Sequence, residues 1–141
     1  NDKTARLWNR QGKLLQTLKG HTNEVWGVSF SPDGQTIATA SNDKTVKLWN
    51  RQGKLLQTLK GHTADVIGVS FNPDGKTIAS ASKDNTIKLW NWEGKLIQIL
   101  NGHKAQVWGV SFSPDGKTIA SASTDGTVRL WKHGSKSKTL D

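Results

Sequence analysis

A repeat with a period of 41 residues runs along this chain and constrains its fold more than any other feature. A Gly-His pair occurs at Gly20-His21, Gly61-His62 and Gly102-His103, always at that spacing. Two further markers keep the same register: Asp2, Asp43, Asp84 and Asp125, and Trp8, Trp49, Trp90 and Trp131. Markers in one register indicate tandem structural units, each of which buries its apolar surface against its neighbours.

Within one period the residues predict four short strands joined by tight turns. The segment 24–30 (EVWGVSF) is rich in β-branched and aromatic residues, and the turn Ser31-Pro32-Asp33-Gly34 follows it. Pro fixes φ in such a turn and Gly accepts a positive φ. Three more strands are expected, separated by short polar turns, at 36–41, 45–50 and 54–59. The unit is therefore predicted to be a four-stranded antiparallel meander, and the chain to be all-β.

The composition is that of a folded, soluble protein. Hydrophobic residues make up only 33% of the chain, but its seven Trp and fourteen Gly suit a β-rich fold. No run approaches the roughly 18 apolar residues of a membrane span, and the first residues lack the pattern of a signal peptide. Cys is absent, which excludes disulfides and thiolate chemistry and fits a reducing compartment. We expect a cytoplasmic protein without membrane contact.

The motifs of the repeat resemble those of the WD repeat (WD40) family. Gly-His, Ser-Pro-Asp-Gly, Ser-x-Asp and Leu-Trp-Asn follow one another at this period, over the whole chain except the tail from about Lys132. The uniformity of the units is similar to that of bacterial, especially cyanobacterial, WD proteins. The family name expects Trp-Asp where this chain has Trp-Asn or, once, Trp-Lys. The resemblance implies one β-propeller blade per repeat, with strands a to d running from a central channel to the rim.

On this pattern the chain divides into about three to three and a half blades. The expected ranges are 1–20 (strands c and d), 21–60, 61–101, 102–132 (strands a to c) and 133–141 (a degenerate strand d or a disordered tail). A propeller ring usually needs about four to eight blades. Because the chain starts at Asn1 rather than Met, we expect it to be a fragment of a longer protein. We expect the ring to be closed by that parent chain or by homo-oligomerisation, in which a neighbour supplies the missing strands.

A His, a Ser, an Asp and a Trp recur together in every repeat. They could suggest a hydrolase triad, but a catalytic set is needed once, beside an oxyanion site, and not in each repeat with a Trp. A Trp N–H, a hydroxyl, a His ring and a carboxylate can satisfy one another's hydrogen bonds, and the WD resemblance implies a structural tetrad here. The expected tetrads are His21, Ser41, Asp43 and Trp49; His62, Ser82, Asp84 and Trp90; and His103, Ser123, Asp125 and Trp131.

No other pattern points to catalysis, to a metal or to a cofactor. No Gly-rich phosphate loop stands between a strand and a helix. Three of the four His residues lie in the repeat register, without the spacing of a metal site. The fourth, His133, is expected to be merely solvated. We expect no catalytic residue, no metal, no cofactor and no enzymatic activity.

Residues that vary between equivalent repeat positions are candidates for partner binding, because the invariant ones are explained by folding. We name the following set the channel-mouth face: Glu24, Asp65 and Gln106, three residues after each His; Trp26, Ile67 and Trp108, five after it; and Asn42, Lys83 and Thr124, before each tetrad Asp. The resemblance places this set around the mouth of the channel, where WD proteins commonly bind partners. Trp26 and Trp108 could be partner anchors or inward packing residues of strand a, and both interpretations stay open. Trp92, which replaces Arg10 and Arg51 in the c–d turn, is expected to be exposed.

The leading functional hypothesis is a non-enzymatic scaffold that mediates protein–protein interaction through the channel-mouth face. A net charge of +9 allows an alternative, a basic propeller that binds nucleic acid or acidic partners, although the charges are spread rather than clustered. Nucleic-acid binding would weaken steeply with salt. A further alternative is the regulatory C-terminal propeller of a multidomain kinase or NTPase.

Overall fold

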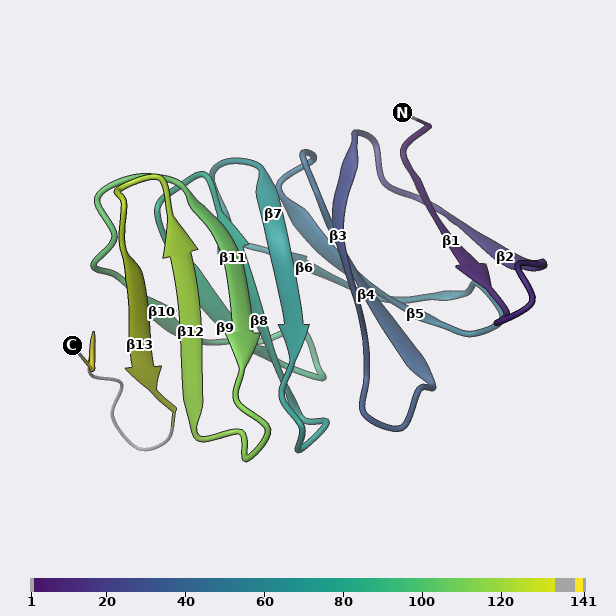
Figure 1. The fold of residues 1–141 in the computed structure, drawn as a ribbon. Helices are drawn as coiled ribbons and strands as arrows, with labels where there is room; N and C mark the ends of the chain where they lie inside the picture. The colour runs from purple at the N-terminus through teal and green to yellow at the C-terminus, as the bar shows by residue number, and fades with distance from the viewer. Residues whose placement is uncertain (1, 134–138, 141) are drawn as a thin grey trace.

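The chain forms short antiparallel strands throughout (Figure 1). A computed structural model describes residues 2–133 and 139–140. The strands are β1 (Thr4–Trp8), β2 (Leu14–Lys19), β3 (Val25–Phe30), β4 (Thr36–Ser41), β5 (Thr45–Asn50), β6 (Leu55–Lys60), β7 (Val66–Phe71), β8 (Thr77–Ser82), β9 (Ile87–Asn91), β10 (Leu96–Leu100), β11 (Val107–Phe112), β12 (Thr118–Ser123), β13 (Val128–Lys132) and β14 (Thr139–Leu140). In the first full repeat these bounds lie within one residue of those expected from the sequence.

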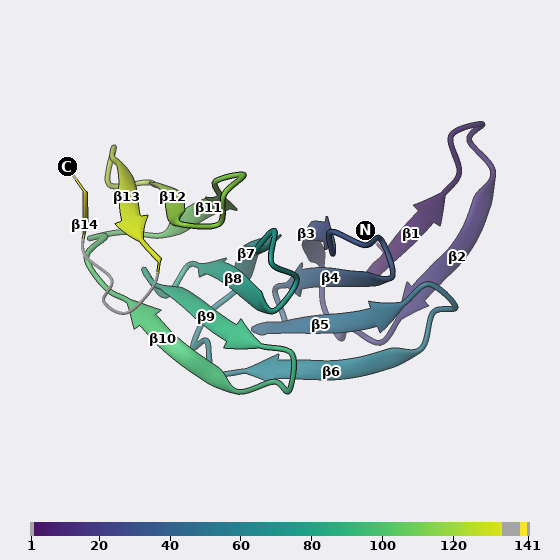
Figure 2. The same cartoon turned by 90° about the horizontal axis from the view of Figure 1, so that it is seen from below.

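The strands pair in chain order into separate sheets. One sheet contains β1 and β2, and three four-stranded meanders follow: β3 to β6, β7 to β10 and β11 to β14. The sheets lie side by side in an open arc, with β3, β7 and β11 on its inner side and β2, β6 and β10 on its outer side (Figure 2). The predicted all-β architecture of four-stranded blades is confirmed.

The core lies between consecutive sheets, because neighbouring sheets cover each other's faces. Every residue of β4 and β8 is buried, and each strand combines one bulky Ile with small Ala, Ser and Thr residues. Apolar residues of the first meander, such as Val46 and Leu48, pack in one cluster with Val66 and Ile78 of the second. An equivalent cluster joins the second meander to the third. Burial on both faces explains why β4 and β8 carry only small or apolar side chains, without charged residues on either face.

Close approach of the inner strands depends on glycine. A Cβ atom on Gly27 would lie 2.8 Å from the carbonyl oxygen of Ile67, and a Cβ atom on Gly68 would lie 3.1 Å from that of Trp108. At the equivalent Gly109 no atom lies within 4 Å of the same point. The inner edges of the sheets therefore touch backbone to backbone wherever a following sheet is present.

The last expected segment, 133–141, is described in part. Thr139 and Leu140 pair with β13 as a short fourth strand. Residues 134–138 and 141 lie outside the described residues. Among the residues that are described, no helix has the length and apolar character needed to cross a bilayer.

Candidate functional site

Each four-stranded sheet contains a chain of hydrogen bonds that links a Trp, a hydroxyl, a His and an Asp. In the first meander, Trp49 Nε1 donates to Thr39 Oγ1 over 2.8 Å, and that hydroxyl lies 2.6 Å from His21 Nε2. His21 Nδ1 lies 2.7 Å from Asp43 Oδ2. Because the carboxylate only accepts, Nδ1 carries the proton, and Nε2 accepts from the hydroxyl. The network therefore runs in one direction, from the indole to the carboxylate.

The same network occurs in the other two meanders with nearly the same geometry. His62 Nδ1 lies 2.7 Å from Asp84 Oδ2, and Trp90 Nε1 donates to Ser80 Oγ over 2.8 Å. In the third meander the corresponding groups are His103, Asp125, Ser121 and Trp131. The network joins the loop before strand a to the turn between strands b and c and to strand c. It therefore holds the loop that leads into strand a in a fixed position against the rest of its sheet.

The prediction of which hydroxyl residue belongs to each tetrad was wrong. The network contains Thr39, Ser80 and Ser121, and not Ser41, Ser82 and Ser123, which lie two residues later. Both hydroxyls of a strand lie on the same side of it, because side chains alternate with a period of two. Ser41 ends β4, where its hydroxyl donates to the Glu24 carbonyl over 2.8 Å and accepts the Asp43 N–H over 3.0 Å. Ser41 therefore shapes the turn that holds the Asp. The sequence does carry a signal for the correct position, since a hydroxyl residue recurs at 39, 80 and 121.

In the networks of the first two meanders, burial lowers the pKa of the His and hydrogen bonds lower the pKa of the Asp. Burial lowers the pKa of His21 and of His62, and outweighs the opposing effect of the neighbouring carboxylate. Burial alone would raise the pKa of Asp84, but the hydrogen bonds from His62 and Thr86 lower it well below the usual value. The side chain of His62 is only 1% exposed. The His and Asp are therefore committed to the fold and are closed to a substrate.

The structure brings the channel-mouth positions together in pairs at one end of the strands of each meander. The backbone N–H of Asn42 donates to the Glu24 carbonyl over 2.9 Å, and the same bond recurs in the other two meanders. The side chains are also linked within each meander. Trp26 donates its indole N–H to Asn42, and Trp108 donates to the Thr124 hydroxyl over 2.9 Å. In the middle meander, Lys83 Nζ lies 3.3 Å from Asp65 Oδ2.

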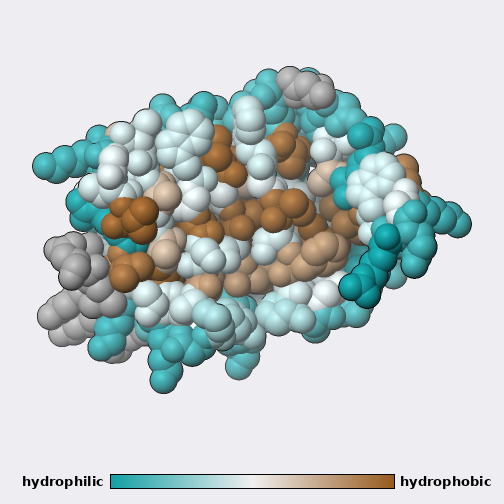
Figure 3. All heavy atoms as spheres, in the orientation of Figure 1, coloured by the Kyte–Doolittle hydropathy of each residue, from teal (hydrophilic) through white to brown (hydrophobic). Residues whose placement is uncertain are grey.

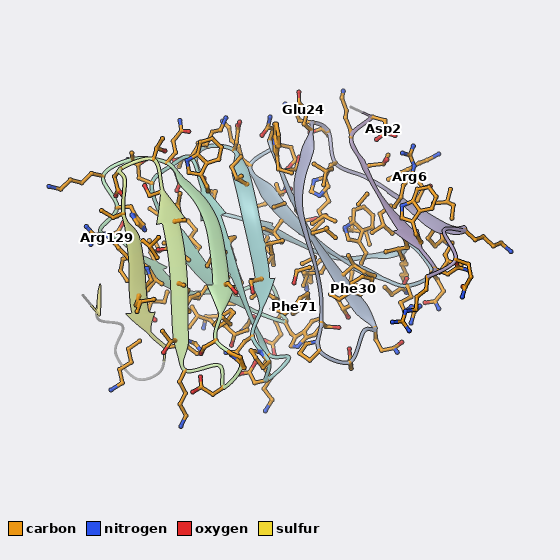
Figure 4. The ribbon with its side chains drawn as sticks, in the orientation of Figure 1. Asp2, Arg6, Glu24, Phe30, Phe71 and Arg129 are labelled. Atoms are coloured by element: carbon orange, nitrogen blue, oxygen red, sulfur yellow. The ribbon has the colours of Figure 1, made fainter. Side chains whose placement is uncertain are left out.

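The two Trp residues of the channel-mouth face are not core residues. Trp26 is 54% exposed and Trp108 is 50% exposed, whereas Ile67 at the same position is half-buried. Both side chains are therefore half exposed and lie outside the buried core. Figure 4 labels Glu24 at the upper end of β3 and Phe30 at its lower end, so the two ends of the strands can be told apart there.

The expectations for Trp92 and His133 were wrong for a common reason. Both occupy the same repeat position, where the chain turns back against the a–b turn of its own sheet. Trp92 is half-buried, donates its N–H to the Gly75 carbonyl and lies with its ring 5.7 Å from that of Phe71. The ring of His133 lies 5.6 Å from that of Phe112, and within the described chain its buried Nδ1 has no hydrogen-bond partner. Neither residue is simply solvated.

The described residues contain no cluster of three or more His, Cys, Asp or Glu side chains placed to hold a metal ion. The titratable groups that do meet, the His and Asp of each repeat, are those of the hydrogen-bonded networks.

Comparison with known proteins gives one family and several relatives. The model of the WD40 family (WD domain, G-beta repeat) matches residues 12–50, 53–91 and 94–132. The nuclear distribution protein nudF of Emericella nidulans is 44% identical over 41 residues, which are 29% of this chain and 9% of that protein. An uncharacterized WD repeat-containing protein of Synechocystis sp. is 56% identical over 32 residues, 23% of this chain and 9% of the relative. The matched part therefore spans about a tenth of these relatives.

Proposed function

The chain belongs to the WD40 repeat family, and on this premise we propose that it is a non-enzymatic scaffold that binds a protein partner through the channel-mouth face. The proposal is carried by the half-exposed Trp26 and Trp108, whose indole N–H groups are already bonded to Asn42 and Thr124. A Trp ring held in this way presents apolar surface to a partner with little further loss of side-chain freedom. Exposed Trp residues are frequent anchors of protein interfaces.

The other residues of the face favour a protein partner over a nucleic acid. The face combines the carboxylates of Glu24 and Asp65 with a single ammonium group, that of Lys83. Lys83 is paired with Asp65, so its charge is partly neutralised. An aromatic anchor with a polar rim of both signs is the usual make-up of a protein interface. The positive charge of the chain is therefore not concentrated where the anchors lie.

Photo-crosslinking tests this proposal. A benzoylphenylalanine placed at position 26 or 108 is used to capture the partner from cells. The same residue at position 117, in an a–b turn at the opposite end of the strands, is the control. The affinity of the captured protein is then measured for Trp26→Ala and Trp108→Ala. We expect a loss of about tenfold or more in at least one variant. Unchanged affinity in both variants, or capture mainly of nucleic acid in a salt-sensitive manner, would reject the proposal.

We also propose that copies of the chain associate through the outer face of the last meander. Val128 is 70% exposed there, whereas its repeat equivalent Val46 is 0% exposed beneath the next sheet. In Figure 3, hydrophobic residues are visible over β12 and β11 of this meander, and the band continues over β7 and β3 on the inner side of the arc. Apolar surface that the repeat buries elsewhere favours a further sheet at this position. Light scattering at several protein concentrations and two salt levels tests this, and a monomer under all conditions would exclude it.

A further inference from the structure

A cleft of about 250 Å³ lies between the first two a–b turns, and we name it the hairpin cleft. Its lining consists of Ser31, Pro32 and Asp33 from one turn, Pro73, Asp74 and Gly75 from the next, and Trp92. In an antiparallel meander, successive turns lie at alternate ends of the strands. The hairpin cleft therefore lies at the strand ends opposite to those that carry the channel-mouth face. Figure 4 shows these strand ends, where Phe30 ends β3 and Phe71 ends β7 just before the two turns.

The cleft combines an aromatic wall with two carboxylates. The indole of Trp92 is held in place by its bond to the Gly75 carbonyl and by the ring of Phe71. Asp33 Oδ1 accepts the Ser31 hydroxyl over 2.6 Å and the Gln35 N–H over 2.9 Å. Asp74 Oδ1 accepts the Lys76 N–H over 2.7 Å. Each carboxylate is thus oriented by its own turn.

The second oxygen of each carboxylate is free to bind a ligand. Within residues 2–133, neither Asp33 Oδ2 nor Asp74 Oδ2 accepts a hydrogen bond from a protein group, and neither side chain forms an ion pair. These two carboxylates remain unpaired although the chain carries 20 Lys and Arg against 11 Asp and Glu. Two unpaired carboxylates beside an indole ring favour a cationic ligand.

The neighbouring pair of turns shows what closes such a space. Asn72 stands where Ser31 stands one repeat earlier, is only 2% exposed, and donates through Nδ2 to the Gly116 carbonyl over 3.4 Å. A Cβ atom on Gly116 would lie 2.4 Å from Asn72 Oδ1, whereas a Cβ atom on Gly75 would meet only Pro32, at 3.9 Å. The shorter Ser31 therefore leaves open the space that Asn72 fills in the next repeat.

We propose that the hairpin cleft binds the guanidinium group of an arginine side chain on a protein partner. A planar guanidinium stacks on an indole face and presents parallel N–H donors to carboxylates, whereas a lysine ammonium is more strongly hydrated and cannot stack. The volume suits one such side chain. This site lies at the opposite ends of the strands from the channel-mouth face and does not depend on the function proposed for that face.

The test uses the ¹⁵N-labelled full chain and a capped Gly-Arg-Gly peptide as the probe. The indole N–H signal of Trp92, assigned by its loss in Trp92→Phe, is followed during the titration. We expect a saturable shift with a dissociation constant on the order of 1–10 mM, as suits a single side chain. The matched peptide with citrulline in place of arginine has nearly the same shape without the charge, and we expect it to bind at least several-fold more weakly.

Four variants complete the experiment. Ser31→Asn introduces the residue that the next repeat tolerates at this position, and we expect it to abolish the shift. Asp33→Asn and Asp74→Asn are each expected to weaken binding about two- to fivefold, and Asp115→Asn, in the third turn, to leave it unchanged. Equal binding of the citrulline peptide, undiminished binding by Ser31→Asn, or no shift of the Trp92 signal would overturn the proposal. Tighter binding of free arginine than of the peptide would reject a protein as the source of the group.

Discussion

His21 and Asp43 are 22 residues apart in the chain, and their side chains meet at 2.7 Å between Nδ1 and Oδ2. The contact joins the loop before β3 to the turn after β4, so it ties together the first two strands of the meander from the edge at which the chain enters. The equivalent pair in the next repeat, His62 and Asp84, meets at the same distance. The repeated contact explains why the His and the Asp keep one register through the sequence.

Removal of this carboxylate is expected to destabilise the fold. In Asp84→Ala the His62 ring and the N–H groups of Thr63 and Thr86 lose their acceptor. We expect a loss of about 1–3 kcal/mol in the free energy of unfolding, measured by urea titration with Trp fluorescence. Glu93→Ala, an exposed substitution, is the control and should change it by less than about 0.5 kcal/mol. Equal stability of the two variants would show that the network contributes little.

The identity of the network hydroxyl can be tested at a single position. Thr39→Ser keeps the hydroxyl, as Ser80 does in the next repeat, whereas Thr39→Val keeps the shape and removes it. We expect Thr39→Val to be less stable than Thr39→Ser by about 1–3 kcal/mol, because Trp49 Nε1 loses its buried acceptor and His21 Nε2 its donor. The same urea titration measures this. If Ser41→Val were the only damaging substitution, the assignment to Thr39 would be wrong.

Acidification is expected to weaken the fold from about neutral pH downward. Burial places the pKa of His62 in the folded chain below the ordinary 6.5, so the unfolded chain binds more protons as the pH falls past that value. Stability is therefore complete above pH 6.5 and declines toward the folded pKa. The lowered pKa of Asp84 adds a second decline below pH 3.8. NMR titration of the His62 ring protons, together with urea unfolding at several pH values, measures the first effect; a His62 midpoint at or above 6.5 contradicts it.

Two classes of Trp should respond differently to truncation. Trp49 is 1% exposed in the core, and Trp49→Ala is expected to cost about 3–5 kcal/mol of unfolding free energy. Trp26→Ala and Trp108→Ala should each cost less than about 1 kcal/mol, because half of each ring already faces solvent. Differential scanning calorimetry of the three variants separates the classes. A large loss for Trp26→Ala would identify that ring as a packing residue and weaken its role as an anchor.

Two equivalent glycines provide a further matched test. Gly27→Ala places a methyl group 2.8 Å from the Ile67 carbonyl oxygen and is expected to cost about 1–3 kcal/mol. Gly109→Ala meets nothing within 4 Å and should be neutral. Chemical unfolding of both variants at low protein concentration checks this. A cost for Gly109→Ala that grew with protein concentration would show that a second copy covers that strand.

The sequence predicts the strands well because their signals are local. Pro32 and Gly34 set the turn after β3, and β-branched and aromatic residues mark the strand itself. The contacts of the site depend instead on where strands from different parts of the chain meet. Thr39 and Ser41 lie on the same side of β4, and only the position of the Trp49 ring decides which hydroxyl it reaches. The burial of Trp92 likewise depends on a turn that lies 17 residues away in the chain.

The pairing of Gly27 with Ile67 and of Gly68 with Trp108 has an evolutionary consequence. Each sheet presents to the next a surface that closely matches the one it receives from the previous sheet. Insertion or deletion of one whole unit of 41 residues therefore joins surfaces that already fit, and requires no compensating substitution. Unequal recombination between such units would change the length of the array while it preserved these backbone contacts between sheets.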